Sequence, residues 1–467
     1  MKTLATLTLA AAVLATAACQ TAPRAPAADI VSPLYPLAAP MDSANAADLA
    51  WQDVLRDPRL QRLVELALTD SRDLRIAVLD AEEARAQLRI RRADQWPQLD
   101  AAGGMNRGRS IGAGATEATT QSQYTANLGL TAFELDLFGR LRAQSQSAFE
   151  TWLAAEEGGK AARITVISTV ADAYLAERAA QERLRLTEAT LEDWRASLAL
   201  AVQLREAGQS SGLEISQAEG QVRGAEADRE AAARALQVAT NALTLAVGTP
   251  LPGDLPAPMA LADRPVQTEI PAGLPADLLA RRPDIRQAEH QLAAANADVT
   301  AARAAFFPRI SLTGLLGFAS GDLDSLFDGA SETWSFAPQI TVPIFQGGRL
   351  KGGLDVAKIR GDRAVASYER TVQTAFREVA DGLAGRATFE RQIIAQSAAV
   401  QAAERRSTLS DLRFRAGVES RLELLDAQRQ LYAARLALVD LRQAQASASV
   451  SLYRALGGGL VEEANGG

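Results

Sequence analysis

The stretch TWSFAPQITVPI, residues 333–344, places an apolar side chain at almost every second position. Trp334, Phe336 and Ile340 alternate with smaller or polar residues such as Ser335 and Gln339. A period of two predicts a β-strand whose two faces meet different surroundings. The aromatic residues on one face favour contact with a membrane.

Three other segments share this pattern. Tyr124, Leu128 and Leu130 alternate with Thr125 and Asn127, whereas the segment after Pro97 shows the weakest alternation. Gly-rich polar loops separate the two members of each pair of segments. We therefore expect four strands, at about 98–108, 122–134, 309–320 and 333–345.

The chain is internally duplicated. Gly139-Arg140-Leu141 returns as Gly348-Arg349-Leu350, and other motifs return in the same order at an offset of 209 or 211 residues. This period is too long for a solenoid repeat, so the sequence predicts two fused halves. We place the halves at 56–248 and 276–457, with a Pro-rich linker at 249–275 and a C-terminal tail at 458–467.

Each half also contains helical patterns. A helix is expected near 56–93 and again near 276–306, and each ends at an aromatic-Pro pair. Long helical runs follow at about 141–205 and 350–415, each roughly 100 Å long if continuous at 1.5 Å per residue. Gly-bearing turns at about 206–213 and 416–421 precede return helices, so each half predicts a long αα-hairpin with a tip.

Composition narrows the function classes. The formal net charge is −7, and the chain has one His and one Cys. The charge provides no basic surface for nucleic acid. A single His and a single Cys leave little room for zinc, Cys-His or Ser-His chemistry, so we expect no enzyme activity, no catalytic residue, no metal and no cofactor.

The N-terminus predicts export. Residues 1–18 have the charge and apolar run of a signal peptide, and they end in Ala17-Ala18 before Cys19. Small residues before a Cys resemble a bacterial lipobox, which implies that Cys19 is lipidated; plain cleavage with a free Cys is the alternative. Thr16 stands where that motif usually has Leu, Val or Ile. Residues 19–55 would be a lipid-anchored segment, and Gln20 implies sorting to the outer membrane.

Four strands cannot close a membrane barrel, which needs at least eight. No stretch after residue 19 is long and apolar enough for a membrane helix, so a membrane-spanning form would be a β-barrel completed by identical chains. A barrel continued by helical hairpins would be a tube. The alternatives are a periplasmic coiled-coil adaptor or scaffold without a pore, and a cell-envelope enzyme.

Several motifs together resemble the outer-membrane factors of tripartite efflux pumps, the TolC/OprM-like NodT lipoprotein family. They include FELDLFGR at 133–140, RRPDIR at 281–286, AAFFPRISL at 304–312, VPIFQGGRL at 342–350 and FREVAD at 376–381. The match covers nearly the whole chain after residue 50.

The resemblance implies an α+β membrane protein with a two-fold internal repeat. Its homotrimer would form a 12-stranded β-barrel, four strands per chain, continued by a long α-helical barrel. It would lie in the Gram-negative outer membrane, contact outer-membrane lipid and extend into the periplasm. It would serve as a passive exit duct for drugs or other small molecules. A periplasmic adaptor (membrane fusion) protein and an inner-membrane pump, of the RND type, would open it at the helical tips.

The family also places the channel aperture at the tips. Glu423 and Asp426 match carboxylates that line the closed entrance in the family, and in a trimer they would form two stacked acidic rings. Their alternative is a solvated helix face. The gate would further include Glu214, Gln217, Glu419 and Arg421, and we hypothesise that Glu214 or Glu419 pairs with Arg421 to hold it shut.

Six further tip residues are expected to contact the adaptor. Gly208 and Gly417 would allow a tight turn or a close approach, although each could also be an ordinary helix cap. The full set is Gly208, Ser211, Leu213, Gly417, Ser420 and Leu422.

Overall fold

The computed structural model describes residues 46–111, 117–271 and 279–461. The predicted signal peptide, Cys19 and most of the segment 19–55 lie outside these residues. The described residues form two compact units, one built from 81–155 and 287–369 and the other from the rest. No helix within the described ranges is long and apolar enough to cross a membrane.

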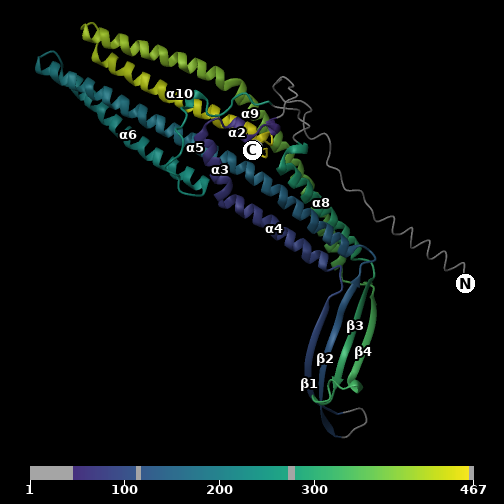
Figure 1. Cartoon of the computed structure of the whole chain (residues 1–467). Helices are drawn as coiled ribbons and strands as arrows, with labels where there is room; N and C mark the ends of the chain where they lie inside the picture. Colours follow the sequence, from purple (N-terminus) through teal and green to yellow (C-terminus); the bar gives the residue numbers. More distant parts are fainter. Residues whose placement is uncertain (1–45, 112–116, 272–278, 462–467) are drawn as a thin grey trace, which may run out of the picture. The chain divides into compact units, whose positions relative to one another are not determined.

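The first unit contains a four-stranded antiparallel sheet in the order β1-β2-β3-β4 (Figure 1). The strands are β1 (Leu99–Ile111), β2 (Ala118–Leu135), β3 (Arg309–Ser320) and β4 (Glu332–Thr341). The first hairpin is longer than predicted because pairing continues to Ile111 opposite Ala118. β4 ends at Thr341 rather than near 345, since Pro343 has no backbone N–H to donate to a ladder.

The register places the apolar residues of the four strands in rows. Trp334 lies opposite Leu316, which lies opposite Leu128, and Leu128 lies opposite Ala101. Because side chains alternate across a sheet, this row shares one face. The adjacent row, from Thr333 through Gly317 and Asn127, lies on the other face. The sheet therefore has one apolar and one mainly polar face.

One sheet glycine has a packing reason. A Cβ added to Gly317 would lie 2.2 Å from the carbonyl oxygen of Ala126 and 2.5 Å from the side-chain oxygen of Asn127. Such contacts do not occur without backbone movement, so a larger residue here would push β2 and β3 apart.

The long helices are α5 (Arg140–Glu206) and α9 (Arg349–Arg415), each of 67 residues. The return helices are α6 (Gly212–Val247) and α10 (Arg421–Ala455). In Figure 1, α6 runs alongside α5 and α10 alongside α9. The glycine pairs at 158–159 and 352–353, which could have interrupted the long helices, lie inside them. Both predicted αα-hairpins are therefore present in the structure.

The short helices differ from the prediction. The expected helix 56–93 is two helices, α3 (Pro58–Asp70) and α4 (Arg72–Ala93). Ser71 separates them because its backbone is extended, and its hydroxyl accepts a hydrogen bond from the N–H of Leu74. The matching helix α8 (Pro283–Ala304) begins at a proline, which suits the first helical position.

The core of the second unit lies where both hairpins meet α2 (Trp51–Val54) and α3. Asp57, fully buried, caps α3 through the N–H of Arg59 and accepts hydrogen bonds from the Tyr174 hydroxyl and the N–H of Met259. Short helices η1 (Ala46–Asp48) and η2 (Leu261–Asp263) flank this core, and η3 (Gly329–Ser331) precedes β4. The linker thus packs against the first half of the repeat.

Candidate channel aperture at the helical tips

The two hairpin turns use the same backbone motif. At the first, the N–H of Gln209 donates to the carbonyl of Leu204, and Gly208 has a φ of 73°. At the second, Val418 donates to Arg413, and Gly417 has a φ of 72°. A six-to-one hydrogen bond with a left-handed residue inside it is a Schellman motif. Both predicted tip glycines therefore end a helix, and their contact with an adaptor stays a prediction.

The first tip then starts α6 with a complete capping box. The Ser211 hydroxyl accepts from the N–H of Glu214 at 3.3 Å, and the Glu214 carboxylate accepts from the N–H of Ser211 at 3.1 Å. The Ser210 hydroxyl also donates to this carboxylate, at 2.6 Å. These hydrogen bonds, with the charge of Arg421, lower the pKa of Glu214 despite slight desolvation. The Glu214 carboxylate therefore accepts its hydrogen bonds at the start of its own helix, α6.

The second tip uses its acidic residues differently. The Ser420 hydroxyl accepts from the N–H of Glu423 at 3.4 Å, but the Glu423 carboxylate lies 3.6 Å from Arg406 on α9. The same guanidinium lies 3.0 Å from Asp426. Glu423 and Asp426 thus share a helix face, and both are joined to the other arm of their own hairpin through Arg406.

The hypothesised ionic latch has other partners within one chain. The Glu419 carboxylate lies 2.9 Å from Arg413 and accepts a hydrogen bond from Ser410. Glu214 acts on Arg421 electrostatically, but among the described residues neither carboxylate forms an ion pair with Arg421.

Arg421 is instead the most buried charged residue of the tips. Only 1% of it is exposed, although it is the first residue of α10. Its Nη2 donates to the carbonyl oxygen and, at 2.9 Å, to the hydroxyl oxygen of Ser197 on α5. Its guanidinium carbon lies 5.3 Å from the ring centre of Phe414. Burial lowers the pKa of Arg421, while the Glu214 charge raises it.

The remaining predicted contact residues lie at the surface. Leu213 and Leu422, at matching positions of the two tips, are more than half exposed. Ser211 and Ser420 are exposed and cap their helices, and Gln217 is half-buried on α6. An exposed leucine next to each turn is available to a partner, so these positions stay predictions for adaptor contact.

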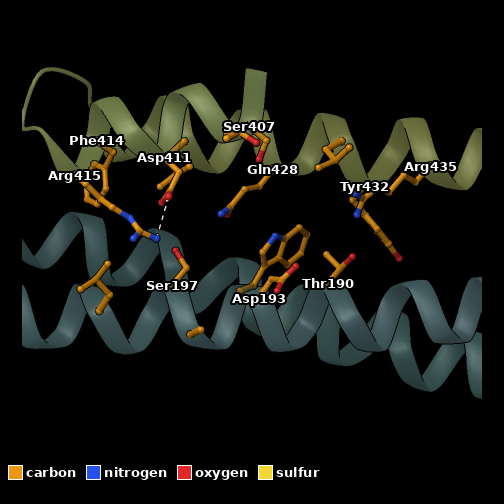
Figure 2. Close-up of a pocket in the computed structure, with 16 residues that line it drawn as sticks. Thr190, Asp193, Ser197, Ser407, Asp411, Phe414, Arg415, Gln428, Tyr432 and Arg435 are labelled. Atoms are coloured by element: carbon orange, nitrogen blue, oxygen red, sulfur yellow. Dashed lines mark ion pairs between the residues drawn. The ribbon is translucent and has the colours of Figure 1, made fainter. Parts of the chain in front are cut away.

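A groove lies between the two hairpins, and its lining runs from Phe414 near the second turn to Arg435 farther along α10 (Figure 2). Its volume is about 430 Å³, and α5 lines one side while α9 and α10 line the other. Trp194 packs edge-on against Tyr432, with ring centres 5.8 Å apart, and the Tyr432 hydroxyl lies 2.9 Å from that of Thr187. This aromatic contact joins the hairpins farther from the turns.

Sequence reasoning missed Ser197 and Arg406, the two partners on the long helices. They occupy matching positions of the duplication, at the offset of 209 residues. Extending the repeat alignment from the tips back into the long helices would have shown this pair. It would not have shown what either side chain contacts.

The comparisons with known proteins agree with this geometry. The family model described as outer membrane efflux protein matches residues 63–249 and again 274–458, which are the two halves of the duplication. The chain is 45% identical to the antibiotic efflux pump outer membrane protein ArpC of Pseudomonas putida, over 95% of this chain and 92% of that protein. It is also 45% identical to the toluene efflux pump outer membrane protein TtgC of the same species, over 92% and 90%.

A solved structure shows the same fold. The open state of the MtrE outer membrane channel of Neisseria gonorrhoeae superimposes with a TM-score of 0.86, at 39% identity over 94% of this chain and 98% of that one. The predicted α+β channel fold, with four strands and two long hairpins per chain, is thus confirmed, as is location in the outer membrane. The poreless periplasmic scaffold is excluded. The chain belongs to the outer membrane efflux protein family and is the outer-membrane channel of an efflux pump.

Proposed function

We propose that this channel is a homotrimeric, passive exit duct that opens when partner proteins engage the helical tips. The observation that carries the trimer is the open sheet: within the described residues, β1 and β4 each pair along one side only. Unpaired edges with an apolar face are unstable in a membrane. Two copies would supply only the minimum of eight strands for a membrane barrel, whereas three supply twelve, the number that the family resemblance implies.

The partners follow from the role of an efflux-pump component. A periplasmic adaptor would contact the exposed tip residues Leu213 and Leu422, and an inner-membrane pump of the RND type would supply the energy. The duct itself would carry out no reaction and need no cofactor or metal, consistent with its single His and single Cys. The relatives are named for antibiotic and toluene efflux. We therefore propose small organic molecules as cargo.

The gate would lie at the second tip. In a trimer, Glu423 and Asp426 would form acidic rings around the axis, and Arg406 would hold them to α9 in the closed state. Glu214, Gln217, Glu419 and Arg421 would lie around this aperture, outside the acidic rings. A lipid on Cys19 would anchor the chain to the outer membrane.

Deletion and complementation test this function. Loss of the gene should raise the accumulation of a fluorescent efflux substrate such as Nile red several-fold, and the full-length gene should restore export. The protein should run as a heat-resistant trimer from outer-membrane fractions. A monomer in the periplasmic fraction, or unchanged accumulation, would contradict the proposal. Mass spectrometry of the mature N-terminus tests the lipid on Cys19 separately.

A further inference from the structure

Arg421 occupies an unfavourable place for a charge. It is buried, it has no ion pair within the part of the chain that the structure describes, and its Nε has no hydrogen-bond partner there. It also stands at the first position of α10, next to the positive end of the helix dipole. A buried charge without a counter-ion is costly, so its position calls for a functional reason.

The contacts that hold Arg421 join both hairpins. Ser197, which accepts its hydrogen bonds, belongs to α5 of the first hairpin, whereas Phe414 belongs to α9 of the second. Both residues also line the groove between the hairpins, on facing sides (Figure 2). The guanidinium therefore connects the start of α10 to the opposite hairpin.

The duplication explains why the two tips differ in this connection. Ser197 matches Arg406, and Arg421 matches Gly212, at the offset of 209 residues. In the second half Arg406 clamps the two arms of one hairpin through Glu423 and Asp426. In the first half the small Ser197 leaves room for Arg421 to enter from the other hairpin.

We propose that Arg421 and Ser197 form a latch that holds the second hairpin against the first in the closed channel. The proposal rests on the proposed gating at the tips. The latch is weak because its acceptors are neutral rather than carboxylates. Its release returns the guanidinium to water, which offsets part of the lost hydrogen bonding. The tip of the second hairpin can then move without breaking an ion pair, because the ion pair between the hairpins, from Arg183 to Asp440, lies farther from the turns.

Single-channel recording of the full-length trimer in planar bilayers tests the latch. Arg421→Met should raise the fraction of time open by more than tenfold, because it removes both charge-assisted hydrogen bonds to Ser197. Ser197→Ala should raise it by about tenfold, because the bond to the backbone carbonyl remains. Ser197→Asp should lower that fraction, because it gives Arg421 a carboxylate partner. Arg223→Met, which removes an arginine whose side chain is 80% exposed on α6, should match the wild type.

A second readout separates the latch from the pore. Hydrogen–deuterium exchange at residues 194–200 and 421–428 should rise in Arg421→Met and Ser197→Ala but not in Arg223→Met. Raised exchange with no current from any variant would contradict the duct and keep the latch. Unchanged exchange and an open fraction within twofold of the wild type, in trimers that assemble, would overturn the latch. If Arg421→Met fails to assemble, Arg421→Lys and the two Ser197 variants decide.

Discussion

The two hairpin tips share a turn and differ in where their charges go. Both end the outgoing helix with a glycine in a Schellman motif. The first tip then uses its carboxylate, Glu214, to cap its own helix. The second directs the matching carboxylate, Glu423, across the hairpin to Arg406. The two tips therefore share a backbone conformation, while one uses its carboxylate for a local cap and the other for a contact between helices.

Reversing the charge of Arg406 should have the largest effect on the second tip and its gate. Arg406→Glu would place three carboxylates together on α9 and α10, where like charges repel. We expect more than a tenfold rise in the fraction of time open, measured in planar bilayers. Arg435→Glu is the matched control, because Arg435 pairs with Glu404 at 2.7 Å between the same two helices, farther from the turn. Equal effects of the two substitutions would place the gate elsewhere.

Neutralising the carboxylates of the second tip should lower the ion selectivity of the channel. Glu423→Gln combined with Asp426→Asn should lower the preference for cations several-fold, as read from the reversal potential in a salt gradient, because the acidic rings would be lost. Glu214→Gln should change it much less, since that carboxylate is held by Ser210 and Ser211. An equal loss from Glu214→Gln would argue that both tips line the aperture.

Removing the two helix caps should have smaller effects, and these should differ between the tips. Ser211→Ala should destabilise the start of α6 by about 1 kcal/mol, a usual effect of losing a helix cap. Ser420→Ala should cost less, because Glu423 does not return a hydrogen bond to its N–H. Amide exchange at the first turns of α6 and α10 measures both. The reverse order would mean that the second cap is the stronger one.

Lowering the pH should destabilise the first tip more than the second, and this is the smallest of the expected effects. Hydrogen bonds from Ser210 and Ser211 hold the pKa of Glu214 below its ordinary value of 4.5. A lowered pKa in the folded state stabilises the tip above pH 4.5, and the stabilisation is lost as the pH falls through the lowered value. The start of α6 should therefore loosen in acid, seen as faster proteolysis at the first tip. Glu214→Gln should remove this pH dependence, and its persistence would exclude Glu214 as the cause.

The periodicity of apolar residues in the sequence was sufficient to predict the strands and helices that are buried on one face only. The alternation in β4 and the long helical runs predicted four strands and two hairpins, because burial on one face leaves a period in the sequence. Gly208 and Gly417 could be predicted as possible helix ends because glycine commonly follows the last turn of a helix. The break at Ser71 was not predicted, although a serine followed by an acidic first turn is a local signal for a helix start.

The side-chain partners at the tips could not be predicted from local sequence patterns. Arg421 was expected to meet a carboxylate, but it meets Ser197, which is 224 residues away in sequence. Arg406 was not singled out at all. Such contacts depend on how helices from different parts of the chain pack, and one sequence carries no direct record of that packing.

The differences between the tips lead us to place the aperture at the second tip. Block by Cd²⁺ of single-channel current through full-length Asp426→Cys trimers tests it most directly, because three thiolates around a narrow axis would bind the ion. Gln217→Cys, at the matching position of the first tip, is the comparison. We predict that micromolar Cd²⁺ blocks the Asp426→Cys channel and leaves Gln217→Cys conducting. Equal block of both channels, or block of Gln217→Cys alone, would contradict this placement of the aperture.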